Sequence, residues 1–212
     1  MFVTIEGIDN VGKTTICDIL RRRLSNSYSV RIVSDPTRVP PWGSSRHILL
    51  GDKRVTPNAR AMMLLASRID AYERVIKPAL RKRELVLGDR FTDSWLAYQA
   101  VMTTHHFRTT TNAMRFLKSL NELCMKNLLI GHPDKTFLIT ADPRETIKRG
   151  KGKRASVFDS TRVQRNVQRN YLRLAEESGT KIEIIDSRGL SVNELALSLE
   201  TKIRTFLGRG WS

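Results

Sequence analysis

The sequence predicts a doubly wound α/β fold, in which helices cover both faces of a five-stranded parallel sheet. The first observation is a set of short, β-branched apolar runs without polar alternation, as strands buried on both faces require. They lie at 2–5, 30–33, 85–87, 137–140 and 182–185. The second is that a longer segment with helical periodicity follows each run. Because 212 residues are too few for two full-sized α/β domains, we expect a single domain over 1–212.

Helices are expected at 13–25, 57–83, 111–127, 159–178 and 191–206. Two of them carry start signals. Thr56 precedes a proline, which suits the first helical position, and Ser191 stands three residues before Glu194, as in a capping box.

One segment between the fourth strand and the next helix does not suit a packed core. Residues 148–154 read KRGKGKR, a basic run interrupted by glycines. We expect a mobile loop here.

The composition excludes several classes of protein. With 40% hydrophobic and 27% charged residues, the chain is typical of a folded globular domain rather than a disordered one. No apolar run approaches the ~20 residues of a membrane span, and the first residues resemble a strand rather than a leader, so no membrane association and a cytoplasmic location are expected. Cys17 and Cys124 lie far apart, which argues against a disulfide framework or a structural zinc site.

The charge is unusual, because 37 Lys and Arg against 21 Asp and Glu give a net charge of +16. Such a field attracts anionic partners, which can be nucleotides, nucleic acid or acidic surfaces. A basic stripe at helical spacing reads as a solvated face or as a nucleic-acid footprint: Arg162, Arg165, Arg169 and Arg173.

A phosphate-binding motif follows the first strand. Residues 7–14, GIDNVGKT, match GxxxxGK[ST] and lie directly before a helical pattern, which is the context that this motif requires. Its glycines let backbone N–H groups surround phosphate oxygens, Lys13 reaches the β- and γ-phosphates, and the Thr14 hydroxyl binds magnesium. The candidate ATP-binding residues are Gly7, Asp9, Asn10, Val11, Gly12, Lys13, Thr14 and Thr15.

A second polar pair, Asp89 and Arg90, follows the third strand. Ligands of doubly wound sheets bind at the carboxyl ends of strands, so this pair is expected to face the same crevice. Asp89 could hold the metal through water, and Arg90 could grip an acceptor phosphate. The alternative is an ordinary surface ion pair at a strand end.

Two segments together resemble the signatures of thymidylate kinases: residues 5–15 (IEGIDNVGKTT) and 89–99 (DRFTDSWLAYQ). The segments 35–38 (DPTR), 64–68 (LLASR) and 171–175 (YLRLA) also resemble that family, and the likeness covers nearly the whole chain. It implies the P-loop kinase fold. It also implies transfer of the ATP γ-phosphoryl group to dTMP, giving dTDP, with Mg²⁺, by a homodimer that pairs through sheet-covering helices.

The resemblance implies a role for each matching residue. Asp9 would accept a hydrogen bond from the deoxyribose 3′-hydroxyl, Arg90 and Arg38 would bind the acceptor's own phosphate, Arg68 would read thymine O4, and Tyr98 would crowd the 2′ carbon. The implied substrate-binding set is Asp9, Arg38, Leu64, Arg68, Arg90, Ser94, Trp95, Tyr98 and Gln99.

Family members place a catalytic cation either in the phosphate loop or in a lid. Because Asn10 and Val11 are uncharged and the segment 148–158 is basic, the chain resembles the lid-supplied type. Arg149 and Lys153 are therefore expected to act with Lys13 and Arg90. The lid shows Ser156-Val157-Phe158-Asp159 in place of the usual Asp-Arg pair, so which lid cation acts stays open.

Two departures fall where the base should bind. The resembled family usually has a phenylalanine that stacks on thymine at the position of Leu64. It usually has a small or amide residue at the position of Trp95. The altered pocket raises the alternative of a kinase for a modified pyrimidine deoxynucleotide. The +16 charge raises another, a DNA-binding kinase that acts on bases within the polymer.

Overall fold

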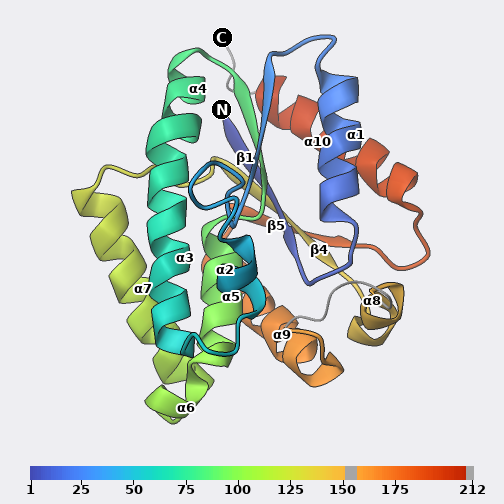
Figure 1. Cartoon of the computed structure of the whole chain (residues 1–212). Helices are drawn as coiled ribbons and strands as arrows, with labels where there is room; N and C mark the ends of the chain where they lie inside the picture. Colours follow the sequence, from blue (N-terminus) through green and yellow to red (C-terminus); the bar gives the residue numbers. More distant parts are fainter. Residues whose placement is uncertain (151–156, 209–212) are drawn as a thin grey trace.

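The sheet has five parallel strands, as the sequence predicted. The computed structural model describes residues 1–150 and 157–208. The strands are β1 (Phe2–Gly7), β2 (Val30–Ser34), β3 (Leu85–Asp89), β4 (Lys135–Thr140) and β5 (Ile182–Asp186). Their order is β2-β3-β1-β4-β5, which places β1 at the centre (Figure 1).

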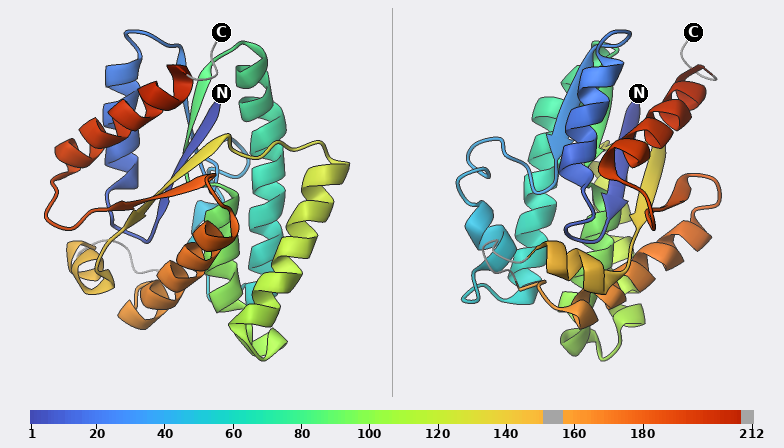
Figure 2. Two further views of the ribbon diagram at one scale, coloured as in Figure 1. Left: turned by 180° about the vertical axis from the view of Figure 1, so that it is seen from behind. Right: turned by 90° about the vertical axis from the view of Figure 1, so that its right-hand side faces the viewer.

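One face of the sheet is covered by α1 (Lys13–Leu24) and α10 (Val192–Gly208), which lie side by side (Figure 2). Val3 and Ile5 of β1 are fully buried in the core on this side. The predicted capping box begins α10, since Ser191 N–H donates to Glu194 Oε2 over 2.7 Å and Glu194 N–H donates to Ser191 Oγ over 3.2 Å.

The other face carries a long helical rod and three further helices. The rod runs through α3 (Pro57–Ala71), the π-helical η1 (Tyr72–Ile76) and α4 (Lys77–Arg81), close to the single helix predicted over 57–83. Its start at Thr56 is confirmed, because the threonine side chain accepts from the Ala59 N–H. Also on this side are α5 (Thr92–Met102), α7 (Thr110–Asn127) and α9 (Thr161–Glu177).

The sequence did not predict α5, α2 (Arg46–Gly51), α6 (Thr104–Phe107) or α8 (Pro143–Arg149). The absence of a signal for α5 has a physical cause, because the residues 94–100 are all buried and leave no polar face to create a helical period.

The start of the expected lid is also corrected. Lys148 and Arg149 belong to the last turn of α8 rather than to a loop. The Asp142 side chain caps that helix by accepting from the Arg144 N–H over 2.8 Å, and a proline follows at the first helical position. Residues 151–156 lie outside the described part of the chain. None of the described helices has the length and apolar content that crossing a bilayer demands.

Candidate active site

The loop after β1 wraps tightly in front of α1. Gly7 has φ 143° and lies against the Ile139 carbonyl, where a Cβ would collide. Gly12 has φ 100° and stands at the N-cap of α1, so both positions favour glycine. The Lys13 side chain folds back into the loop and Nζ donates to the Ile8 carbonyl over 2.6 Å. Burial, together with the charge of Arg90, lowers the pKa of Lys13 to about 7.

The two predicted magnesium ligands meet at the edge of this loop. Thr14 Oγ1 donates to Asp89 Oδ2 over 2.6 Å. A hydroxyl and a carboxylate are donors that suit Mg²⁺, which in nucleotide sites takes its remaining ligands from phosphates and water. Over residues 1–150 and 157–208, no cluster of three or more His, Cys, Asp or Glu could hold a metal by itself.

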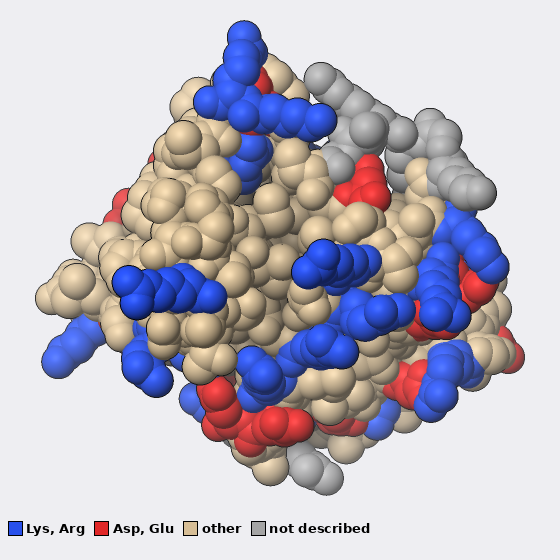
Figure 3. Space-filling model, turned by 90° about the horizontal axis from the view of Figure 1, so that it is seen from below, with Lys and Arg blue, Asp and Glu red and all other residues tan. Residues whose placement is uncertain are grey.

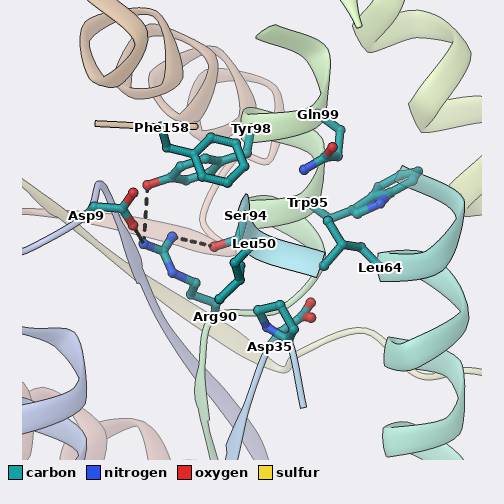
Figure 4. A pocket seen from close by; sticks show the side chains of 11 residues that line it. Asp9, Asp35, Leu50, Leu64, Arg90, Ser94, Trp95, Tyr98, Gln99 and Phe158 are labelled. Atoms are coloured by element: carbon teal, nitrogen blue, oxygen red, sulfur yellow. Dashed lines mark hydrogen bonds and ion pairs between the residues drawn. The ribbon is translucent and has the colours of Figure 1, made fainter. Parts of the chain in front are cut away.

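Arg90 is the centre of the site. Its Nη1 donates to the Gly7 carbonyl over 2.9 Å. Its Nη2 donates to Asp9 Oδ1 over 2.6 Å (Figure 4). It also donates to the hydroxyls of Ser94, Tyr98 and Tyr171. Burial alone would lower the pKa of Arg90, but Tyr98, Tyr171 and the Asp9 carboxylate hold it well above its ordinary value, so the guanidinium stays charged.

The Asp9 carboxylate stays ionised for a related reason. Burial would raise its pKa, but the charges of Arg90 and Lys13 outweigh that effect and lower it. Asp89 and Arg90 are not the ordinary surface ion pair that the sequence left open, because Asp89 accepts from Thr14 Oγ1 while Arg90 donates to Asp9 Oδ1. Asp9 and Arg90 lie just beyond two neighbouring strands, since Ile5 of β1 pairs with Asp89 of β3.

A buried carboxylate that sequence reasoning missed lies beneath this pair. Glu6 is fully buried and accepts from the Phe91 N–H over 2.7 Å and from the Tyr171 hydroxyl over 2.9 Å. It therefore fixes the first turn of α5 and the tyrosine that contacts Arg90. The sequence signal that could have indicated Glu6 is a charged residue near the end of an otherwise apolar strand.

A pocket opens beside Asp9 and Arg90 (Figure 4). The structure brings together seven of the predicted substrate-binding residues there: Asp9, Leu64, Arg90, Ser94, Trp95, Tyr98 and Gln99. Four further residues that the prediction lacked line it as well: Asp35, Pro36, Leu50 and Phe158.

Leu64 and Trp95 form one wall of this pocket (Figure 4). Trp95 is 3% exposed and its indole N–H donates to the Ala61 carbonyl over 2.9 Å. Gln99 Oε1 is buried and has no hydrogen-bond partner among the described residues. The wall thus combines a broad apolar surface with one polar group.

Arg68 does not line this pocket. Its side chain is fully buried, with the guanidinium carbon 4.9 Å from the Trp95 ring centroid, and it donates to Asn121 Oδ1 over 2.9 Å. It lines a small neighbouring cavity together with Asp35 and Arg90. Burial raises the pKa of Asp35 to about 6, although the charge of Arg68 opposes the shift.

The remaining predicted residues lie around the phosphate loop. Arg38 is exposed and lines a third cavity with Thr14 and Asp89. Arg149 is exposed at the end of α8, and the next residue, Gly150, lies against Asn10 of the loop. The predicted lid cation Lys153 lies outside the described residues.

Comparison with known proteins agrees with this architecture. The family profile described as thymidylate kinase matches residues 5–195. The thymidylate kinase of Caldanaerobacter subterraneus is 31% identical over 189 residues, covering 87% of this chain and 86% of that protein. The probable thymidylate kinase of Methanocaldococcus jannaschii is 32% identical over 195 residues, covering 92% and 91%.

A solved structure of thymidylate kinase from Candida albicans superimposes with a TM-score of 0.77 at 24% identity, covering 96% of this chain and 90% of that one. This likeness confirms the fold. The profile match and the identities above go further, and they show that the chain belongs to the thymidylate kinase family.

Proposed function

We propose that this protein transfers the γ-phosphoryl group of ATP to the phosphate of dTMP, giving dTDP and ADP. Family membership supports this reaction. The observation that carries it is the contact between Arg90 and the phosphate loop, since Arg90 Nη1 donates to the Gly7 carbonyl over 2.9 Å. A guanidinium suited to an acceptor phosphate therefore lies against a loop suited to the donor phosphates.

On the donor side, the phosphate loop and Lys13 hold the triphosphate of ATP. Thr14 and Asp89 would hold Mg²⁺, directly or through water, because their oxygens already meet at 2.6 Å. When bound, the ion supplies charge neutralisation to the β- and γ-phosphates.

On the acceptor side, Asp9 accepts from the 3′-hydroxyl and Tyr98 stands near the sugar, where it disfavours a 2′-hydroxyl. Arg38 and Arg90 bind the phosphate of dTMP. The resembled family has a phenyl ring at the position of Leu64 in α3. Trp95 of the neighbouring helix α5 offers a larger π-surface than that ring, so it can stack on the base in its place.

The chemical step needs no general base, because the acceptor phosphate is already anionic at pH 7. One of its oxygens forms a bond to the γ-phosphorus while the bond to the β-γ bridging oxygen breaks and ADP leaves with the electron pair. Catalysis is then alignment and charge neutralisation by Lys13 and Arg90, with Arg149 and Lys153 from the basic segment 148–158 acting as a lid. The single-domain organisation with such a lid stays a prediction.

The two alternatives were a modified pyrimidine deoxynucleotide and bases within DNA as acceptors. The comparisons give neither of them support, because the relatives reported above carry thymidylate kinase names. Because Leu64 and Trp95 depart from the family pattern in the pocket wall, the informative experiment compares several nucleoside monophosphates as acceptors.

That experiment is a coupled ADP-release assay with dTMP, dUMP, dCMP, dAMP, dGMP and UMP. We expect dTMP to give the highest kcat/KM and UMP to fall well below dUMP. A Lys13→Ala control should stay folded while its turnover falls by about two orders of magnitude or more, since one fixed cation beside the transferring group is lost. Turnover of another acceptor in preference to dTMP would refute the proposed substrate, and near-normal turnover by the control would refute the role of the phosphate loop.

We also propose the homodimer and the cytoplasmic location. Phe116 and Leu123 of α7 are 47% and 60% exposed and lie two helical turns apart, which offers an apolar face for a second copy. Sedimentation of the protein and of Phe116→Glu tests the assembly, since a change to monomer in the variant supports this face and a monomeric protein refutes it.

A further inference from the structure

Gln164, near the start of α9, is tied to Asp9 by its side-chain amide. The residue is fully buried although it carries a polar group. Its Nε2 donates to Asp9 Oδ2 over 2.8 Å, and its Oε1 accepts from the Asp9 backbone N–H over 3.0 Å. The carboxylate and the backbone of Asp9 are thus held by the same side chain.

The rest of the amide is also fully used. Nε2 donates a second hydrogen bond to the Phe158 carbonyl over 3.0 Å, and Oε1 accepts a second one from the Tyr98 hydroxyl over 3.3 Å. A primary amide has two donors and two acceptor lone pairs, and all four are satisfied here. The opposite orientation would turn the carbonyl oxygen toward Asp9 Oδ2 and the Phe158 carbonyl, two acceptors, so the network fixes which atom is nitrogen.

This contact determines how Asp9 is presented to the pocket. Arg90 binds Oδ1 and Gln164 binds Oδ2, and the Tyr98 hydroxyl also hydrogen-bonds to this carboxylate. A carboxylate has about four lone-pair sites, so it keeps capacity for another donor. The Asp9 side chain is 30% exposed and lines the pocket. Arg90 has a second task, because it is proposed to bind the acceptor phosphate. Gln164 differs from Arg90 in this respect, because it binds Asp9 and is not proposed to contact the substrate.

The contact also connects Asp9 to the segment before α9. Phe158, whose carbonyl Gln164 holds, lines the same pocket and packs edge-on against Tyr98 with ring centroids 5.1 Å apart. A single amide therefore sets Asp9 relative to two aromatic walls of the acceptor site.

We propose that Gln164 is a positioning residue that orients Asp9 for the 3′-hydroxyl of the acceptor. The inference rests on the proposed function and deepens it, since it names the residue on which recognition of the 3′-hydroxyl depends. An apolar residue of similar size would leave Asp9 Oδ2 without this donor and the Asp9 N–H without an acceptor, both of which carry a cost where they are buried.

The test is a substrate cycle that pairs Gln164→Leu with two acceptors. One acceptor is dTMP and the other is 3′-deoxythymidine monophosphate, which lacks only the 3′-hydroxyl. We expect Gln164→Leu to lower kcat/KM for dTMP by about tenfold, the loss of one hydrogen bond to a charged group. The value for the 3′-deoxy acceptor should stay within about twofold, and the KM for ATP should not change.

Gln168→Leu is the matched control. Gln168 lies one turn further along α9, and its Oε1 accepts from the Ala141 N–H over 3.2 Å. It therefore also anchors α9 to a backbone amide, but not through Asp9. This variant should lower kcat/KM equally for both acceptors or not at all. An equal loss for both acceptors in Gln164→Leu, or no loss in either, would overturn the proposal.

A second variant keeps the proposal testable if Gln164→Leu folds poorly. In Gln164→Glu, the new carboxyl can donate to Asp9 only while it is protonated, and above its pKa it repels the Asp9 carboxylate. The ratio of wild-type to variant kcat/KM for dTMP should therefore rise between pH 5.5 and 8, while the ratio for the 3′-deoxy acceptor stays flat. The same pH dependence for both acceptors, or none for either, would contradict the inference.

The outcomes also separate this inference from the proposed function. A wild-type protein that does not phosphorylate dTMP refutes the function itself. A wild-type protein that uses both acceptors with equal kcat/KM refutes the role of Asp9 at the 3′-hydroxyl, and with it the role of Gln164, while the kinase activity stands.

Discussion

The indole ring of Trp95 packs against the guanidinium of Arg68, with the guanidinium carbon 4.9 Å from the ring centroid. Trp95 lines the pocket beside Asp9 and Arg90, and Arg68 does not. Arg68, which the resemblance predicts to read the base, is therefore in contact with Trp95, which stands where the family has a small or amide residue. Such a cation–π contact in a desolvated setting is worth about 2 kcal/mol, so it stabilises both side chains in this arrangement.

Replacing Trp95 tests whether the indole forms part of the base site. Trp95→Ala removes a buried aromatic ring, so we expect a lower melting temperature and an acceptor KM raised by about tenfold or more, with the KM for ATP unchanged. Leu96→Ala is a suitable control, because Leu96 is 5% exposed on the same helix and does not line the pocket. It should lower stability alone.

The companion change is Leu64→Phe, which enlarges a side chain that already lies beside Trp95 in the pocket wall (Figure 4). We expect it to crowd the pocket and to leave dTMP binding no better. The opposite result would be tighter dTMP binding by Leu64→Phe, with Trp95→Ala lowering the melting temperature but not changing the acceptor KM. That result would show that the indole contributes to packing and not to recognition of the base.

ATP binding should take up protons at alkaline pH. The pKa of Lys13 is lowered to about 7 in the ligand-free site, so at pH 8 the side chain is mostly neutral. The phosphates of ATP favour the charged form and raise that pKa, so binding takes up a proton and weakens as pH rises above 7. The Kd for ATP should rise by up to about tenfold per pH unit in this range. Calorimetry at pH 8 in buffers of different ionisation enthalpy measures the uptake, which should vanish in Lys13→Met.

The end of α8 offers a test of the proposed lid. Arg149 is exposed and precedes Gly150, which contacts Asn10 of the phosphate loop. Arg149→Ala should lower kcat by about tenfold or more and change the acceptor KM less, because such a cation acts mainly after closure. Arg144→Ala, an exposed arginine near the start of the same helix, is the control. Full kcat in Arg149→Ala and in its double variant with Lys153→Ala would exclude a lid-supplied mechanism.

The surplus charge should not make the protein a tight DNA binder. Figure 3 shows Lys and Arg side chains spread over one face of the molecule with acidic side chains among them. The stripe at Arg162, Arg165, Arg169 and Arg173 is exposed along α9. We expect weak retention on DNA near physiological salt, measured by titration at several salt concentrations. Tight binding there, with phosphate transfer into the polymer, would instead support the DNA kinase.

The sequence predicted those parts of the fold and site that depend on local pattern. Buried strands such as 2–5 and 85–87 are continuous apolar runs, and the phosphate loop is a contiguous motif. By contrast, α5 is buried along 94–100 and has no polar face, so nothing in its sequence distinguishes it from a strand or a loop.

Other features depend on contacts between distant residues and leave no local signal. Gln164 is one polar residue in a helix that carries many, and its importance arises only because α9 brings it to Asp9, which is 155 positions away. The packing of Trp95 on Arg68 likewise requires that α3 and α5 lie side by side. Local sequence patterns indicate a role for Asp9 and for Arg68. They do not show that Gln164 contacts Asp9 or that Trp95 contacts Arg68.

The hydrogen bond between Asp9 and Arg90 joins residues 81 positions apart. Each residue lies just beyond the end of a strand, β1 or β3, and these two strands pair in parallel. During synthesis on the ribosome, the phosphate loop emerges long before β3 has been made. An early nascent chain therefore exposes the loop without the arginine that completes the site, and the two halves can meet only after β3 has inserted next to β1. A ligand that needs both the phosphate loop and Arg90 can therefore stabilise the chain only once the centre of its sheet has assembled.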